Sequence, residues 1–412
     1  MTELAAKIEA YDRGMLCDAL SRVRDVHENA ELCIGVLAGE RTTVVALDSS
    51  GRAQPSAEEE SAKRGPLGCV AKALTGTLAL IAAAEGRIDF ACGLTETDDP
   101  LLYSWIRDTT VRQLLSHTHG LDASHIKRIA QTSAGRIDVR ALSDSLREAR
   151  RLFEPGALYS YSNAGPWLVA ALLEKVYSAR FADLLVARVL GPAGIEIDID
   201  REPYWCPSMG GDLHLSVPEL LRFFRWFFRQ HDLCRHAELD VSVPPPGWCL
   251  ERGSCAGWKY YGSGWYGHNM AVRKQSLFVC AQFEEGIAIV VSAREAPTDT
   301  AGMTLLRVFG RLLPQFVGMR IPKALEVPME ISDTAERVGA YGNQAITIRI
   351  SSDEQSGLRA EVFRDGAAER CDALKPGTDG TYLLESLPLQ FIPNGNSGYT
   401  HLWNGREVLR RV

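Results

Sequence analysis

The sequence has no long hydrophobic run, no cysteine pair at metal-binding spacing and no excess of basic residues. Its longest largely apolar run, Val70–Ala84, has 15 residues and is too short to cross a bilayer as a helix. The first 20 residues mix charges with apolar residues, which does not fit a secretory signal. We therefore expect a cytoplasmic protein with no membrane partner.

Metal and nucleic-acid functions are equally poorly supported. The ten cysteines include no Cys-x-x-Cys pair and no zinc-like ligand spacing, so we expect neither a metal nor a cofactor. The formal net charge is −7 and the basic residues are spread along the chain, which argues against nucleic acid as a partner. With 46% apolar and 24% charged residues, the 412-residue chain is typical of a globular protein with two or three structural units.

The pattern of elements predicts an α+β fold. Two β-rich runs, Leu32–Leu37 and Thr42–Leu47, are separated by a short turn and predict a hairpin. Helical signals then dominate, including a continuous helix expected over Ala164–Leu190, before β patterns return near residue 261. An α-rich segment between β-rich flanks predicts an antiparallel β-sheet flanked by helices, with an inserted helical subdomain at about residues 73–255.

The end of the chain changes character. After a proline-containing stretch, short alternating runs are separated by Gly, Asn and Asp turns, which is typical of a small β unit. We therefore predict a main domain over residues 1–320, a linker over residues 321–328 and a small all-β domain over residues 329–412.

The first candidate for chemistry is the pair Cys69 and Lys72. Lys72 is the only charged residue in an otherwise apolar run, and a buried ammonium is costly unless a partner stabilises it. On a helix these two side chains share a face, and a cysteine at the helix N-terminus is favoured as a thiolate. The pair has the parts of an activated nucleophile. Taken alone, however, a Cys-x-x-Lys pair is weak evidence, and a small buried side chain followed by a stray charge is the more common explanation.

Two further segments could contribute to the same cleft. Tyr161 and Asn163 are two residues apart in a loop after a Pro-Gly turn, where both side chains can face one way, although such a turn also caps helices. His268 enters a predicted strand after a glycine-rich approach, where an imidazole and backbone N–H groups could polarise a carbonyl. A single histidine in this setting more often has a structural role.

In this order, the three segments resemble the serine β-lactamase and penicillin-binding-protein superfamily, in its class C β-lactamase and esterase branch. That family has Ser-x-x-Lys, then Tyr-x-Asn, then a Lys/His-Thr/Gly-Gly motif on a strand. The phrases "TTVRQLLSHTHGL", "FEPGALYSYSNAGPWLVAALLE" and "GGDLHLSVPELLRF" also resemble family phrases, and the resemblance covers about residues 30–315. It implies a β-lactamase/transpeptidase-like catalytic domain, and the tail resembles the lipocalin-like β domain of some members.

The resemblance implies three catalytic residues and three substrate-binding positions. The nucleophile, its activating base and a proton relay are, in this order, Cys69, Lys72 and Tyr161. A substrate-amide contact, the third-motif residue and a backbone N–H of the oxyanion hole are assigned to Asn163, His268 and Ala271. The second N–H of that hole would be the one of Cys69 itself.

Two departures from the family pattern matter. The nucleophile is a cysteine, and the third motif carries Asn269 and Met270 where small residues are usual, so both side chains are expected to narrow the cleft. A thiol with an ordinary pKa of about 8.5 ionises before an amine of about 10.4, so Cys69 and Lys72 are expected to rest as thiolate and ammonium. The acyl-enzyme would be a thioester.

We therefore expect an acyl-transfer enzyme that forms a thioester on Cys69 and passes the acyl group to an amine or alcohol, in specialised metabolite biosynthesis. The donor would be a small-molecule ester, amide or thioester, with a carrier protein or coenzyme A as alternative carriers. Two other functions stay open: a hydrolase of esters, amides or peptides that uses the same site, and a non-catalytic protein that retains the pocket for binding. An engineered serine-to-cysteine replacement also fits the sequence.

Overall fold

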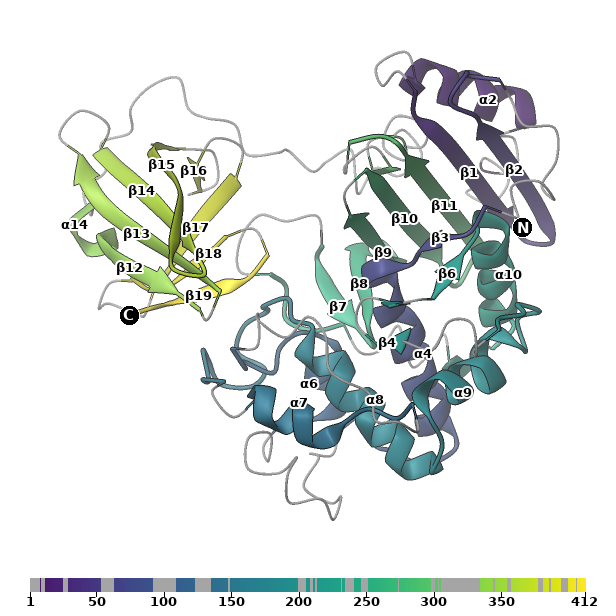
Figure 1. Ribbon diagram of the computed structural model, residues 1–412, viewed down its shortest axis with the longest axis horizontal. Helices are drawn as coiled ribbons and strands as arrows, with labels where there is room; N and C mark the ends of the chain where they lie inside the picture. The colour runs from purple at the N-terminus through teal and green to yellow at the C-terminus, as the bar shows by residue number, and fades with distance from the viewer. Residues whose placement is uncertain are drawn as a thin grey trace.

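A computed structural model places a large antiparallel sheet with helices on both faces beside a small β-barrel (Figure 1). The residues that the structure describes are 8, 12–24, 29–52, 63–91, 109–122, 135–146, 149–198, 205–207, 210–211, 213–230, 232–233, 241–245, 251–272, 274–297, 301–302, 304, 334–343, 345–353, 357–376, 381–384, 387–393, 399–404 and 406–412. The expected linker over residues 321–328 lies outside them.

The main sheet has seven strands in the order β2-β1-β11-β10-β9-β8-β7, each antiparallel to its neighbours. The N-terminal hairpin joins the later strands through β1 and β11, which pair along their whole length. The hairpin predicted from the sequence is present as β1 and β2. The strands are β1 (Glu31–Ala38), β2 (Arg41–Leu47), β7 (Gly253–Cys255), β8 (Trp258–Gly262), β9 (Trp265–Val272), β10 (Gln275–Gln282) and β11 (Ile287–Arg294).

Helices cover both faces of this sheet. On one face, α2 (Arg13–Arg24) contributes Leu16 and Leu20 to a core that it shares with side chains of β1, β10 and β11. On the other face, α10 (Val217–Phe228) packs on β1 and β11, where Gly35 leaves room for side chains of the helix. The sheet is therefore the middle layer between two apolar cores.

Two buried helices, α4 and α8, form the centre of the helical part. Both are apolar on nearly all sides because they pack on each other and on the shorter helices around them. The helical elements are η1 (Gly68–Val70), α4 (Ala71–Ala84), α6 (Val111–Leu115), α7 (Val139–Leu146), α8 (Ala164–Tyr177), α9 (Phe181–Leu185) and η3 (Val186–Leu190). Two short ribbons pair β3 (Gly65–Pro66) with β6 (His214–Leu215) and β4 (Trp205–Cys206) with β5 (Gly210–Gly211).

The prediction of one continuous helix over Ala164–Leu190 is wrong, because the first helix, α8, ends at Tyr177. Ser178 adopts a left-handed backbone with φ of 54°, and a new helix begins at Phe181. The buried carboxylate of Glu174 stabilises the break, since it accepts hydrogen bonds from the N–H of Phe181 at 2.7 Å and of Ile137 at 2.9 Å. The apolar spacing continues across this break, so periodicity alone did not reveal it.

The last unit is a closed barrel of eight strands around its own apolar core. The predicted fold class, an α+β domain followed by a small all-β unit, is therefore confirmed. A short helix, α14 (Thr334–Arg337), precedes the barrel. Its strands are β12 (Gly339–Gly342), β13 (Ile346–Asp353), β14 (Gly357–Arg364), β15 (Ala367–Pro376), β16 (Tyr382–Leu384), β17 (Leu387–Pro393), β18 (Tyr399–Trp403) and β19 (Val408–Arg411).

Gly68 allows the turn before α4 to pass closely under β9. Its φ is 50°, and a Cβ there would lie 2.0 Å from Met270 Cγ. We expect Gly68→Ala to lower the free energy of unfolding by about 2 to 4 kcal/mol, measured by chemical denaturation, because it adds both backbone strain and a clash. Gly86→Ala is the control, since its φ is also left-handed at 69° but a Cβ would meet nothing within 4 Å. Equal losses in the two variants would contradict the role of the Met270 contact.

Candidate active site

Cys69 lies in the 3₁₀ turn that runs directly into α4, at the N-terminal end of that helix. Lys72 follows one turn later and is fully buried. Its Nζ donates a hydrogen bond to Asn163 Oδ1 at 2.8 Å. The structure thus brings the first and second sequence motifs together.

Two glycines press the first turns of α4 against the turn between β7 and β8. A Cβ at Gly76 would lie 1.5 Å from the carbonyl oxygen of Ala256, and one at Gly257 would lie 2.2 Å from the carbonyl oxygen of Lys72. No larger residue fits at either position without moving backbone atoms. This contact between helix and sheet fixes where the Lys72 side chain enters the site.

Tyr161 is surrounded by three cations. Its ring centroid lies 4.7 Å from Lys72 Nζ, 4.7 Å from the guanidinium carbon of Arg406 and 5.5 Å from Lys259 Nζ. Burial raises the pKa of Tyr161 well above its ordinary value, and the charge of Cys69 raises it further. The phenol therefore keeps its proton at neutral pH and can donate a hydrogen bond to a thiolate.

His117 supports the loop that carries Tyr161. Its Nδ1 accepts a hydrogen bond from the N–H of Ser162 at 3.2 Å, and its carbonyl oxygen accepts one from the N–H of Ser160 at 2.8 Å. The rings of His117 and Tyr161 lie 4.6 Å apart. Burial, and then the nearby positive charges, lower the pKa of His117 well below its ordinary value. The imidazole is therefore neutral and serves as a scaffold for the loop.

The surroundings of Cys69 favour its thiolate. Burial by itself would raise the pKa of the thiol, but Lys72, a hydrogen bond with Tyr161 and the charges of Arg406 and Lys259 outweigh it, so the pKa is lowered. Burial lowers the pKa of Lys72 to about 8, and the charge of Cys69 opposes this change. At neutral pH Lys72 is therefore mostly charged, and its charge favours the thiolate form of Cys69.

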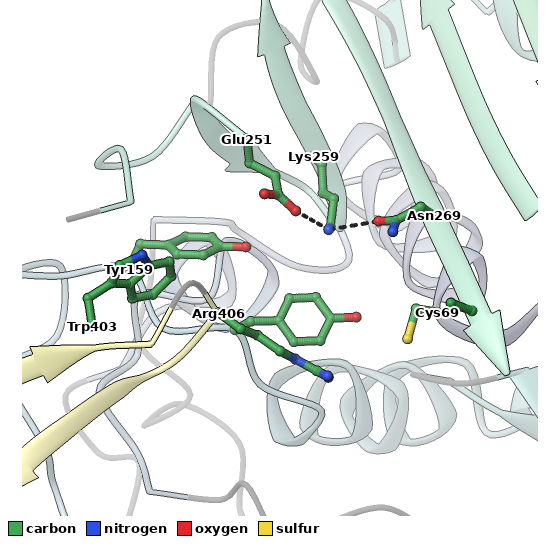
Figure 2. A pocket seen from close by; sticks show the side chains of 9 residues that line it. Cys69, Tyr159, Glu251, Lys259, Asn269, Trp403 and Arg406 are labelled. Atoms are coloured by element: carbon green, nitrogen blue, oxygen red, sulfur yellow. Dashed lines mark hydrogen bonds and ion pairs between the residues drawn. The ribbon is translucent and has the colours of Figure 1, made fainter. Parts of the chain in front are cut away.

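Cys69 faces a cavity of about 260 Å³. Figure 2 shows Glu251, Lys259 and Asn269 in a row along it, while Arg406 and Trp403 approach from the barrel. The other side chains that line the cavity are Tyr159, Tyr161 and Ala271. The site thus combines an acidic residue, two further cations and three aromatic rings around one thiol.

The barrel contacts the Tyr161 loop directly. The N–H of Tyr161 donates to the carbonyl oxygen of Arg406 at 3.1 Å, and the N–H of Val408 donates to Ser160 Oγ at 3.0 Å. The Arg406 side chain is 58% exposed and lines the cavity, where it can contact a substrate. The C-terminal unit is therefore part of the candidate site.

The alternation of side chains along β9 separates the residues of the third motif. Asn269 and Ala271 line the cavity, whereas His268 and Met270 are buried on the other face of the strand. Met270 packs over Gly68, so of the two side chains expected to narrow the cleft, Asn269 is the one in the cavity. Burial lowers the pKa of His268 well below its ordinary value, so its ring is neutral. Its substrate-binding role stays a prediction.

The described residues contain no group of three or more His, Cys, Asp or Glu side chains arranged to hold a metal ion. Within the same parts of the chain, no helix is both long and apolar enough to traverse a membrane. The seven cysteines that the structure describes are all free thiols, so Cys69 is not tied up in a disulfide.

Residues 43–208 match a family model described as Beta-lactamase, and they include both the Cys69-to-Lys72 and the Tyr161-to-Asn163 segments. The chain carries a beta-lactamase domain. Its relation to the penicillin-binding-protein and beta-lactamase superfamily, first drawn from motif order, is thereby confirmed. Comparison with curated proteins gave no match.

Solved structures extend the likeness beyond the beta-lactamase domain. SurE with D-Leu aligns with a TM-score of 0.73 and 22% identity, covering 97% of this chain and 99% of that one. The octameric penicillin-binding protein homologue from Pyrococcus abyssi aligns with a TM-score of 0.56 and 14% identity, covering 97% of this chain and 99% of that one. The D-amino acid amidase from Ochrobactrum anthropi SV3 with D-phenylalanine aligns with a TM-score of 0.55 and 16% identity, covering 77% of this chain and 100% of that one. At these identities the likeness establishes the fold.

Sequence reasoning on the beta-lactamase motifs missed the cavity residues that arrive through tertiary structure. Lys259 is a single charge inside the aromatic strand "WKYYG", which is a weak signal that a charged side chain faces a cavity. Arg406 lies in a polar turn between two strands, and its sequence, which resembles that of an ordinary hairpin turn, does not indicate that the side chain lines a cavity. Glu251, Tyr159 and Trp403 were likewise missed.

Proposed function

We propose that this protein is an acyl-transfer enzyme that forms a thioester on Cys69 and passes the acyl group to an amine or alcohol acceptor. The observation that carries the proposal is the pair formed by half-buried Cys69, whose thiol pKa is lowered, and buried Lys72, beside Tyr161 at a cavity. The surrounding beta-lactamase domain belongs to a superfamily of serine acyltransferases and hydrolases, which supports covalent chemistry at this position.

In the acylation step, the thiolate of Cys69 attacks the carbonyl carbon of the donor, and the bond from that carbon to the leaving group breaks. The leaving group takes a proton from Lys72 or, through its hydroxyl, from Tyr161. A thiolate is well matched to exchange with a thioester donor, because the bond formed resembles the bond broken. We accordingly favour a thioester on a carrier protein or on coenzyme A as donor, with an activated ester as the alternative.

In the transfer step, the acceptor attacks the thioester carbon, the C–S bond breaks and the thiolate of Cys69 returns. The acceptor must lose a proton, and Lys72 is placed to take it. Once Cys69 is acylated, its negative charge no longer raises the pKa of Lys72, which therefore falls below the value of about 8 that it has beside the thiolate. Lys72 thus changes from counter-ion to general base during the cycle.

The donor is proposed to carry a D-configured residue next to the reacting carbonyl. Support comes from the structural neighbours: SurE was crystallised with D-Leu, and two others are a D-amino acid amidase and a D-stereospecific amidohydrolase from Streptomyces sp.. The same neighbours favour a second candidate function, hydrolysis of an amide or ester at the same site, in which water replaces the acceptor.

Intact-mass measurement with a synthetic peptidyl thioester ending in D-leucine tests the proposal. We expect the mass to increase by one acyl group, located on Cys69 by peptide mapping, and no increase in Cys69→Ala. With an amine added, the amide should form faster than the free acid, and the matched L-leucine thioester should react more slowly. Free acid as the main product would establish the hydrolase. No adduct, with equal turnover in Cys69→Ala, would exclude both enzymes and favour a binding protein.

A further inference from the structure

Glu251 and Lys259 form a largely buried ion pair in the cavity that Cys69 faces. Their side chains are 13% and 11% exposed, and Lys259 Nζ bonds to Glu251 Oε1 and, at 2.9 Å, to Asn269 Oδ1. Figure 2 shows these side chains in a row, with the Lys259 ammonium between the two acceptors. The pair comes from β8 and the segment before β7, outside all three motifs recognised in the sequence.

Stability does not explain this pair. Taking two charges out of water costs free energy that their attraction often fails to offset, so buried pairs are poor stabilisers compared with apolar side chains. Lys274 and Glu295 show the ordinary arrangement on the same sheet, where an ion pair is 75% and 60% exposed. The difference in burial indicates that Glu251 and Lys259 serve the cavity.

We propose that Lys259, held by Glu251, is a positioning residue that favours the Cys69 thiolate and orients the Asn269 amide toward the bound acyl donor. The part that concerns the donor rests on the function proposed above. The part that concerns the thiolate is a property of the free protein and does not require acyl transfer.

Among the described residues, the charged and titratable groups around Cys69 come from several packed elements. These groups are Lys72 from α4, Tyr161 from the loop before α8, Lys259 from β8 and Arg406 from the barrel, with Glu251 behind Lys259 and the histidines His117 and His268 behind Tyr161. The phenol and both imidazoles are uncharged, so Tyr161 acts on the thiol through its hydrogen bond and the charges that act on it are those of the cations. Arg406 lowers the pKa of Cys69 more than Lys259 does, but its side chain is 58% exposed and its effect is open to screening by salt, whereas the Lys259 side chain is 11% exposed.

Lys259 also sets the orientation of the Asn269 amide. Its Oδ1 accepts a hydrogen bond from Lys259, so the NH₂ group is the end of the amide that can donate to a ligand in the cavity. A peptidyl or acylamino donor has a carbonyl oxygen close to the reacting carbon, and such an oxygen accepts a bond of this kind. His268 cannot substitute for Lys259, because it is neutral and lies on the opposite face of β9 from Asn269.

The test follows alkylation of Cys69 by iodoacetamide against pH, with peptide mapping to separate this thiol from the others. We expect Lys259→Met to slow alkylation at neutral pH roughly three- to tenfold, because removing a positive charge raises the thiol pKa and shifts the profile to higher pH. Glu251→Gln should shift the pH profile of alkylation to lower pH, because Lys259 then acts on the thiol without the opposing charge of Glu251. The alkylation profile of Lys259→Arg should stay near that of wild type. Lys274→Met, which removes a positive charge at the surface, is the control and should leave the profile unchanged.

The opposite directions of the two shifts separate a specific role from a structural one. A loosened fold would move the profiles of Lys259→Met and Glu251→Gln the same way, and either that result or two unchanged profiles would overturn the proposal. With a peptidyl thioester, Lys259→Met should also raise KM more than it lowers kcat. If wild type forms no acyl adduct, the proposed function fails, while the alkylation profiles still decide whether Lys259 acts on Cys69.

Discussion

Lys72→Met should slow acylation of Cys69 by roughly 10²- to 10⁴-fold, measured as kcat/KM with a thioester donor. Lys72 is the strongest of the charges that lower the pKa of the Cys69 thiol. Without it, burial dominates, the pKa of Cys69 rises and the rising limb of the pH–rate profile moves to higher pH. Methionine has a similar length and no charge, so it fills the same space.

The same substitution should not destabilise the fold. The pKa of Lys72 is lowered from 10.5 to about 8 in the folded protein. Below pH 8 the folded state therefore holds a buried ammonium whose free energy would be lower in the unfolded chain, and this charge destabilises the fold. Removing that ammonium should keep or increase the free energy of unfolding at pH 7, measured by chemical denaturation. Lys175→Met, at the exposed end of α8, is the matched control and should change neither rate nor stability. A Lys72→Met variant that stays fully active would contradict the mechanism.

The sequence was most informative where a motif is compact and its elements are local. Cys69 and Lys72 share one helix, so their common face followed from helical spacing, and Asn163 was placed near them through the motif order of the family. The structure shows the contact itself, the 2.8 Å hydrogen bond from Lys72 to Asn163. Close packing at Gly76 and Gly257, which no motif describes, holds the first turns of α4 against the turn between β7 and β8 and so positions Lys72.

The sequence was least informative where a side chain reaches the site from another element. Arg406 belongs to a barrel whose place beside the Tyr161 loop depends on contacts far apart in the chain. The third motif shows a subtler difficulty, because a one-residue step along a strand changes the face. Asn269 lines the cavity and His268 does not, and the pairing of β9 with its neighbours settles which residue of the motif does so.

Cys69→Ser should show what sulfur contributes to this site. A serine hydroxyl is a very weak acid and cannot rest as an anion beside Lys72, so its proton must be removed by neutral Lys72 during attack. We expect acylation by a thioester at pH 7 to fall roughly 10²-fold or more, since the reaction gains a proton transfer that the thiolate does not need.

The pH profile distinguishes this cause from simple misplacement of the nucleophile. In wild type, the acylation rate should rise with the ionisation of Cys69, whose pKa is lowered by Lys72 and Tyr161 against the effect of burial. In Cys69→Ser the rate should instead follow deprotonation of Lys72. Its pKa of about 8 includes an upward contribution from the thiolate charge, so with a neutral serine the limb should lie below pH 8. A serine variant as fast as wild type at pH 7, or one with an unchanged profile, would show that Cys69 does not react as a preformed thiolate.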